Sequence, residues 1–245
     1  MGFAFGSSKT QFDVAERDTS GLVESNSLAF YGSKDFDKMY LKGALSYDWL
    51  DAETRRFAFV EGSTAPIIPV AGVANNLQAQ FDGKTFNGRL EAGYKTNWKK
   101  LNITPFAGVQ LSFAKIGAAT ETAAESDDAL ALAYSKNDAY SAPVFVGAQI
   151  DSMFMLSEGS IQPYAKLSFA HDFSTKRAME ASFVSAPGYK FEVQGAVPDA
   201  NTMDVNLGFK MTSITNLAFY GQFNGQYSEN GAKNEGGTLG LEVHW

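Results

Sequence analysis

The chain has no cysteine among its 245 residues. This absence excludes disulfide scaffolds, thiolate zinc sites and cysteine nucleophiles. The chain also lacks any run of about 18 apolar residues, so it offers no candidate for a transmembrane helix. Positive charge is scarce, with a net charge of −7 and a pI near 4.9. This balance argues against a nucleic-acid-binding protein, whose phosphate contacts need a basic face.

What the chain does contain is a repeated alternation of apolar and polar residues. Leu90 and Tyr94 share one parity, while Arg89 and Glu91 share the other. Similar runs lie near residues 39–49, 109–113, 144–151, 166–169, 203–211, 217–227 and 237–245. Runs of about ten residues with one apolar and one polar face are what a transmembrane barrel strand requires. The sequence therefore predicts an all-β fold, an antiparallel transmembrane β-barrel of outer-membrane type.

The connections between the runs alternate in length. Short links are expected near residues 32–37, 98–102, 156–160 and 212–216, and long ones near 9–25, 51–78, 116–141 and 174–201. Outer-membrane barrels have short periplasmic turns and long external loops. The alternation places both termini in the periplasm and the long loops outside the cell. An aromatic girdle of Trp245, Tyr94 and Trp98 is expected at the periplasmic edge, and one of Trp49, Phe113, Phe173 and Tyr227 at the outer edge.

The two parities predict which side chains meet lipid and which line the lumen. A Lys or Arg on the lipid face at midplane costs about 2–4 kcal/mol, so the charged parity should face inward. The predicted lipid-facing residues are Leu90, Tyr94, Leu111, Val146, Leu167, Leu207, Phe219 and Val243. The predicted lumen-lining residues are Arg89, Glu91, Lys95, Gln110, Gln149, Asp151, Lys166, Asp172, Asp204, Asn206, Lys210, Gln222, Asn224 and Glu242. Glycines inside strands, such as Gly93, Gly108, Gly147 and Gly208, mark bends or places where a bulky neighbour crosses the wall.

The ordered motifs along the chain resemble the β-domain of autotransporters, the translocator barrel of type V secretion. They are Phe30-Tyr31-Gly32-Ser33, Tyr40-Leu41-Lys42-Gly43-Ala44-Leu45, Arg55-Arg56, Gly88-Arg89-Leu90-Glu91-Ala92-Gly93-Tyr94, Thr104-Pro105-Phe106-Ala107-Gly108, Ser141-Ala142-Pro143, Gln162-Pro163-Tyr164-Ala165-Lys166, Ala170-His171-Asp172-Phe173 and the final strand. The resemblance implies a bacterial outer-membrane location and surface export of an N-terminal passenger. It also implies that the lumen contacts this passenger and that Leu239, Leu241, Val243 and Trp245 form the signal for the barrel-assembly machinery.

The chain departs from this family in strand number. The family barrel has twelve strands with a linker helix in the pore, whereas about ten strands are expected here. We therefore expect one domain over residues 1–245 that lacks the N-terminal hairpin, the helix and the passenger, with an open or strained seam between residues 2–10 and 238–245. The second departure is the terminal Trp245, where the family usually ends in Phe.

Three functions remain open from the sequence. The first is a translocator and anchor barrel, whose partners are its passenger, the assembly machinery, and outer-membrane lipid and lipopolysaccharide. The second is a small porin or adhesin-like barrel without a passenger. The third is a soluble lipid-binding barrel of lipocalin type, which would place its apolar side chains inside.

No reaction chemistry is expected. His171 and His244 lie on opposite parities at opposite ends of the barrel, so they cannot form a metal pair. The acidic loop with Glu121, Glu125, Asp127 and Asp128 is expected to be solvated, with calcium binding a minority alternative because the EF-hand glycine and spacing are missing. The lumen charges either contact a passing segment or simply pair with one another and with water. We predict no catalytic residue, no metal site, no cofactor and no enzymatic activity.

Overall fold

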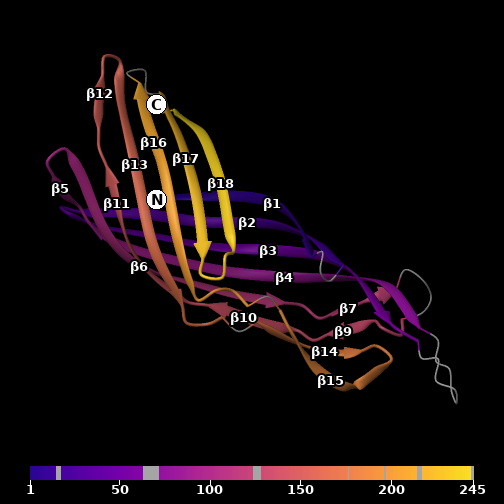
Figure 1. The fold of residues 1–245 in the computed structure, drawn as a ribbon. Helices are drawn as coiled ribbons and strands as arrows, with labels where there is room; N and C mark the ends of the chain where they lie inside the picture. Colours follow the sequence, from indigo (N-terminus) through magenta and orange to yellow (C-terminus); the bar gives the residue numbers. More distant parts are fainter. Residues whose placement is uncertain are drawn as a thin grey trace.

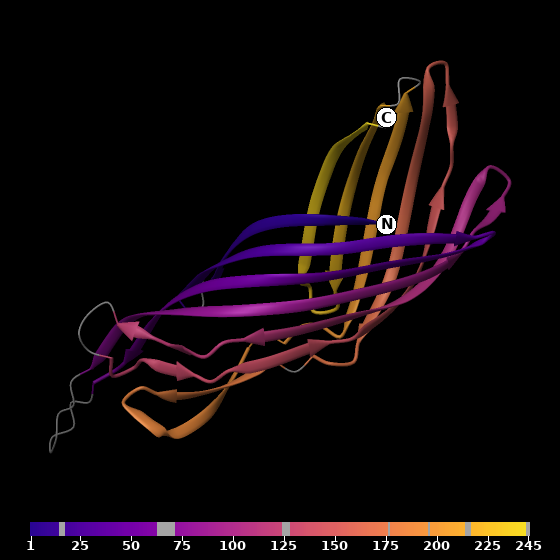
Figure 2. The same cartoon turned by 180° about the vertical axis from the view of Figure 1, so that it is seen from behind.

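The structure is a computed structural model that describes residues 1–14, 18–62, 72–123, 128–175, 177–195, 197–213 and 217–243. These residues form a large antiparallel sheet that curls into a half-barrel (Figures 1 and 2). Its main path runs in chain order through β1 (Gly2–Val14), β2 (Thr19–Phe36), β3 (Met39–Val60), β4 (Val73–Tyr94), β6 (Leu101–Ile116), β11 (Pro143–Asp151), β13 (Gly159–Asp172), β16 (Asn201–Ser213), β17 (Leu217–Ser228) and β18 (Lys233–Val243). The predicted antiparallel barrel architecture of about ten strands is confirmed.

No helix within the described ranges is long and apolar enough to cross a bilayer.

The two ends of the main path do not meet. Among the described residues, β1 pairs only with β2 and β18 only with β17. No backbone ladder therefore joins residues 2–10 to 238–243, which agrees with the open seam expected from the sequence. The first strand and the last strand consequently present unpaired backbone groups along their free edges.

Short turns, the start of β1 and the end of β18 lie at one end of the half-barrel, and the connections β6–β11 and β13–β16 extend from the other (Figure 2). Short strands β5 (Thr96–Trp98) and β12 (Phe154–Leu156) complete hairpins at the short-turn end. Two predicted long loops are wrong, however. Residues 9–25 are mostly strand, because β1 continues to Val14 and β2 starts at Thr19. Residues 51–78 are also largely strand, since β3 continues to Val60 and β4 begins at Val73.

The apolar parity faces outward in the half of the sheet near the chain ends. Leu90, Leu111, Val146 and Leu207 are 48%, 44%, 60% and 48% exposed on the convex side. Tyr94, Leu167 and Phe219 are exposed as well, so the predicted exposure is confirmed for every described member of the set. The side chain of Val243 lies outside the described residues. This arrangement excludes the lipocalin-type alternative, which needs those residues in a closed interior.

The parity inverts farther along the same strands. In β4, Leu77 and Ala79 are buried at 1% and 3% exposure, while the intervening Gln78 and Gln80 are exposed. Leu77 has the same parity as Arg89 and Glu91, which face the concave side. Between Asn76 and Lys84, β4 therefore has an apolar inner face and a polar outer face, as in a soluble sheet.

A second sheet lies at this far end. It has the order β15 (Ala186–Gln194), β14 (Ala178–Phe183), β9 (Leu132–Tyr134) and β7 (Ala119–Thr120). The short strands β8 (Thr122–Ala123) and β10 (Asn137–Ser141) instead extend the main sheet through β4 and β6. Two of the predicted long loops, 116–141 and 174–201, thus contain ordered strands. We call residues 51–60 of β3, residues 73–83 of β4 and this second sheet the extension.

Candidate functional site

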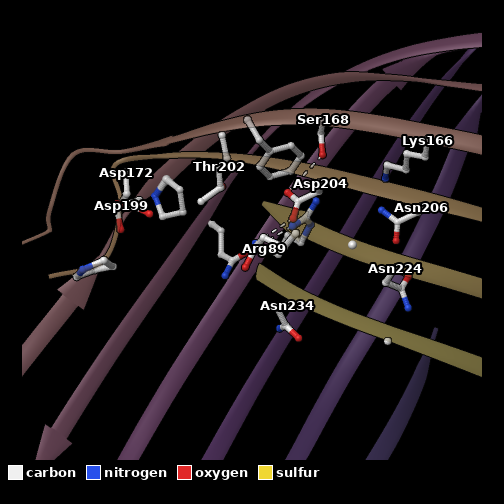
Figure 3. A pocket seen from close by; sticks show the side chains of 18 of the residues that line it. Arg89, Lys166, Ser168, Asp172, Asp199, Thr202, Asp204, Asn206, Asn224 and Asn234 are labelled. Atoms are coloured by element: carbon white, nitrogen blue, oxygen red, sulfur yellow. Dashed lines mark hydrogen bonds between the residues drawn. The ribbon is translucent and has the colours of Figure 1, made fainter. Parts of the chain in front are cut away.

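The concave face of the half-barrel contains a polar hollow of about 910 Å³. Its lining side chains come from β4, β6, β11, β13, β16, β17 and β18 and project into the open interior (Figure 3). Eight residues predicted to line the lumen border this hollow: Arg89, Gln110, Gln149, Lys166, Asp204, Asn206, Gln222 and Asn224. Asp172, which was also expected there, belongs to the same lining.

Amides and mixed charges dominate the hollow. Asp204 accepts a hydrogen bond from Gln226 Nε2 at 2.9 Å, and Gln222 Oε1 accepts one from Tyr164 Oη at 3.0 Å. Asp172 accepts hydrogen bonds from Ser141 Oγ and from the backbone N–H of Ala142 and Ser174. Amide side chains can donate to and accept from any peptide backbone, so this surface suits a polar polypeptide of variable sequence.

Glu91 is the centre of a buried ionic cluster beside the hollow. It accepts hydrogen bonds from Tyr40 Oη at Oε1 and from Lys166 Nζ at Oε2, both at 2.8 Å. Arg89 Nη2 lies 3.5 Å from Oε2. Lys166 reaches Glu91 over β6 and β11, which separate β13 from β4. The Glu91 side chain is only 6% exposed, so its charge depends on these partners.

Aromatic rings on the concave face cover glycines of neighbouring strands and carry the cations. A Cβ on Gly108 would lie 2.3 Å from the Phe145 ring, and one on Gly147 would lie 2.5 Å from Phe106. These two contacts are reciprocal, because Phe106 pairs with Gly147 and Gly108 with Phe145. Lys166 Nζ lies 4.1 Å from the centroid of the Phe106 ring, and the Arg89 guanidinium lies 4.0 Å from that of Phe145. The Phe106 and Phe145 rings therefore fill the space above the glycines and form cation–π contacts with Lys166 and Arg89.

The predicted close approach at glycines is confirmed at Gly93, Gly108, Gly147 and Gly208, which meet Tyr40, Phe145, Phe106 and Tyr164. Sequence reasoning did not identify Tyr40, Phe106 and Phe145 as residues of the concave face. These three side chains are buried together. The sequence feature that could have identified them is an aromatic residue on the polar parity of a strand, paired with a glycine of the next strand.

The other predicted lumen residues lie away from the hollow. Asp151 is buried and accepts hydrogen bonds from Asn102, Gln149 and Gln162. Lys95 lies at the short-turn end and donates to Asp35 at 2.6 Å. Lys210 and Glu242 form an ion pair of 2.7 Å between β16 and β18. Glu91 forms the cluster described above, so the predicted set divides into a hollow, a buried cluster and a rim.

Glu121 corrects one expectation from the sequence. It is not solvated but 3% exposed, in the extension, where its carboxylate accepts hydrogen bonds from Arg56 Nε and Nη2 at 2.7 and 2.6 Å. The backbone N–H of Leu132 and Tyr134 Oη donate to the same carboxylate at 2.8 and 2.9 Å. Burial and the neighbouring Glu121 raise the pKa of Tyr134 to about 12. Among the described residues, no group of three His, Asp or Glu side chains could hold a metal ion.

The architecture defines the class of protein first: a curled sheet with an apolar convex face and a polar concave face is an outer-membrane β-barrel wall. The sequence matches the autotransporter β-domain over residues 1–224, and the chain therefore belongs to this family. A comparison with curated protein sequences finds no match.

A solved structure shows the same fold. The chain is similar to the translocator domain of autotransporter NalP from Neisseria meningitidis, with 12% identity and a TM-score of 0.62 over 98% of this chain and 80% of that one. It is also similar to the transport unit of the autotransporter AIDA-I from Escherichia coli, with 11% identity and a TM-score of 0.48 over 99% of this chain and 88% of that one.

Family membership defines the function in general terms. The chain is an outer-membrane translocator barrel for passenger export, which implies a passenger covalently linked to the domain. Domains of this family are transport barrels and not enzymes.

Proposed function

We propose that residues 1–245 form one β-domain that holds its short turns and both chain ends in the periplasm and its extension outside the cell. The observation that carries this proposal is the change of polarity along β4. Apolar side chains face outward from Phe86 to Tyr94 and polar ones from Asn76 to Lys84. The first stretch has about the length of a transmembrane barrel strand. The second has the pattern of a sheet in water.

The polar side chains predicted to line the lumen act as a conduit and scaffold for the passenger segment. Amides such as Gln110, Asn206 and Asn224 offer short-lived hydrogen bonds to a passing segment. The lining also carries charges of both signs, Arg89 and Lys166 together with Asp172, Asp199 and Asp204, which avoids trapping a segment of one charge. This role needs no bond chemistry, no metal and no cofactor, so we propose that the chain has no enzymatic activity of its own.

We also propose that the final strand presents the signal for the barrel-assembly machinery. Leu239 and Leu241 on β18 are 86% and 62% exposed on the face that would continue to Val243 and Trp245. Trp245→Ala should lower the fraction of chain that shows heat-modifiable migration after membrane isolation, whereas Trp245→Phe should retain it. Equal folded fractions in all three proteins would reject this signal.

Because the chain has no cysteine, its orientation can be read from single introduced thiols. Ser185→Cys lies in the β14–β15 turn of the extension, and Ser157→Cys lies in the short β12–β13 turn. A membrane-impermeant maleimide should label Ser185→Cys in intact cells and Ser157→Cys only after the outer membrane is permeabilised. The reverse pattern would overturn the proposed orientation. Labelling of both positions in intact cells would show that the chain does not span the membrane.

A further inference from the structure

Two lysines lie side by side on the convex face, just beyond its apolar band. Lys84 on β4 and Lys115 on β6 are direct partners in the antiparallel ladder, and both are exposed. Like charges directly opposite each other destabilise a sheet. Neither lysine forms an ion pair with any residue in the described part of the chain. The pair therefore places two positive charges side by side, and neither is in a direct ion pair within the described residues.

Aromatic residues mark the level of this pair relative to the membrane. One step toward the chain ends, Tyr47, Phe86, Phe113 and Tyr140 form a continuous row of direct cross-strand partners. Trp49 stands in the lysine row itself, opposite Lys84. Rows of aromatic side chains mark the boundary between hydrocarbon and headgroups. The ammonium groups consequently lie at the headgroup level.

Acidic side chains confine this positive charge to a single level. Asp51 and Asp82, which are direct partners, form the next row outward, about 7 Å from the lysines. Asp138 lies opposite Lys115 on β10, in the lysine row itself, but the described residues show no ion pair between them. Moving outward from the membrane, the convex face has an aromatic row, then a row with both lysines and Asp138 at its β10 end, then an acidic row. The carboxylates of Asp51 and Asp82 repel an anion from the next row, so an anion attracted to the lysines stays at their level.

We propose that Lys84 and Lys115 bind the phosphate groups of lipopolysaccharide in the outer leaflet. The inference rests on the proposed orientation, which places the extension outside the cell. Each ammonium group donates charge-assisted hydrogen bonds to phosphate oxygens, and the ligand removes the repulsion between the two lysines. Trp49, Phe86 and Phe113 contact the adjoining acyl chains. The lipid thereby fixes the depth of the wall at its outer boundary.

The test measures lipid affinity in micelles, where membrane orientation plays no part. The full chain, folded in detergent, is titrated with lipopolysaccharide and with the same lipid after its phosphates have been removed. Lys84→Gln combined with Lys115→Gln should weaken binding of the phosphorylated lipid on the order of tenfold. Lys84→Arg combined with Lys115→Arg should retain it. The dephosphorylated lipid should bind the original chain and the Gln variant equally.

The matched control is Lys136→Gln combined with Lys190→Gln, which removes the same charge from exposed positions of the far end. This control should bind like the original chain. Equal affinity of the original and the Lys84/Lys115 Gln variant would overturn the proposal, and so would an equal loss in the control. If the double variant does not fold, each single Gln variant should lose on the order of threefold, and no loss in either would overturn the proposal.

Thiol labelling in cells separates this inference from the proposed function. Unchanged micelle affinity in the Gln variant, together with correct labelling of Ser185→Cys, would reject the lipid site and keep the translocator orientation. Wrong labelling together with the predicted affinity loss would reject the orientation and with it the outer-leaflet assignment.

Discussion

The apolar side chains of strand β4 face outward in one half of the strand and inward in the other. From Phe86 to Tyr94 the outward side chains are apolar and the inward ones include Arg89 and Glu91. From Asn76 to Asp82 the inward side chains are apolar and the outward ones polar. The backbone and its ladder to β3 continue without interruption through both halves. The comparison shows that the solvent on each side of a sheet, and not the strand itself, determines which parity is apolar.

Glu91 should be the most sensitive position of the membrane half. Glu91→Gln removes the buried charge that Lys166 and Arg89 share, and breaking a buried ion pair costs up to about 3–5 kcal/mol, less where the remaining cation reaches solvent. Urea titration of the heat-modifiable form in detergent should show this loss. The control is Glu24→Gln, whose partner Lys9 is exposed, and it should change stability by no more than about 1 kcal/mol. Equal effects of the two variants would contradict the role assigned to the Glu91 cluster.

Replacing leucine by alanine should cost more stability in the extension than in the membrane half. Leu77→Ala in the extension leaves a cavity in a buried site and should cost about 2–5 kcal/mol of local stability. Leu90→Ala on the convex face should cost much less, because lipid or detergent fills the space. Hydrogen exchange of the extension and urea titration of the barrel measure the two effects. A larger loss at Leu90 would mean that this residue packs inside.

An introduced positive charge should cost more stability in the membrane half than in the extension. Leu90→Arg places a cation on the lipid face and should cost about 2–4 kcal/mol in bilayers. Gln80→Arg, on the same face of the same strand but in the extension, should stay within about 0.5 kcal/mol. Folding titrations in lipid vesicles give both values. Similar losses at the two positions would place the polarity boundary of β4 somewhere other than near Lys84.

High pH should loosen the extension. Because the pKa of Tyr134 is raised from 10.0 to about 12 by burial and by Glu121, the folded state favours the protonated phenol. Its stabilising contribution is complete below the unfolded value and is lost as the pH rises through about 12. Proteolysis of the β14–β15 hairpin should therefore accelerate between pH 10.0 and about 12, while the gel band of the folded, heat-modifiable barrel persists. Tyr134→Phe should remove that acceleration, and its persistence would assign it to another group.

The membrane half was predictable from the sequence because its signal is local. Alternation of Leu90 and Tyr94 with Arg89 and Glu91 gives the strand, its two faces and its direction of exposure within a few residues. The glycine positions at Gly108 and Gly147 also carried information, since each needs a ring from the adjacent strand. These features depend only on period-two geometry and on the cost of charge in lipid.

The extension was not predicted, because its evidence is visible only after two parts of the chain meet. The sequence predicts a loop over residues 51–78, because Leu77 and Ala79 lie on the parity opposite to that of the lipid-facing residues. Glu121 was expected in water because its partner Arg56 is 65 residues away in sequence. Pairing over such a distance depends on how β9 stacks on the main sheet, which no local pattern encodes.

The contact between Lys166 and Glu91 has a mechanical consequence. It joins β13 to β4 across the concave face, past the two strands between them. This contact favours the bent sheet although the edge strands β1 and β18 do not pair. A sheet that already has its final curvature loses little further freedom when its two edges are joined. Joining the two edges would then require little further bending of the sheet, because the contacts of Lys166, Glu91 and the two rings are made only in the bent form.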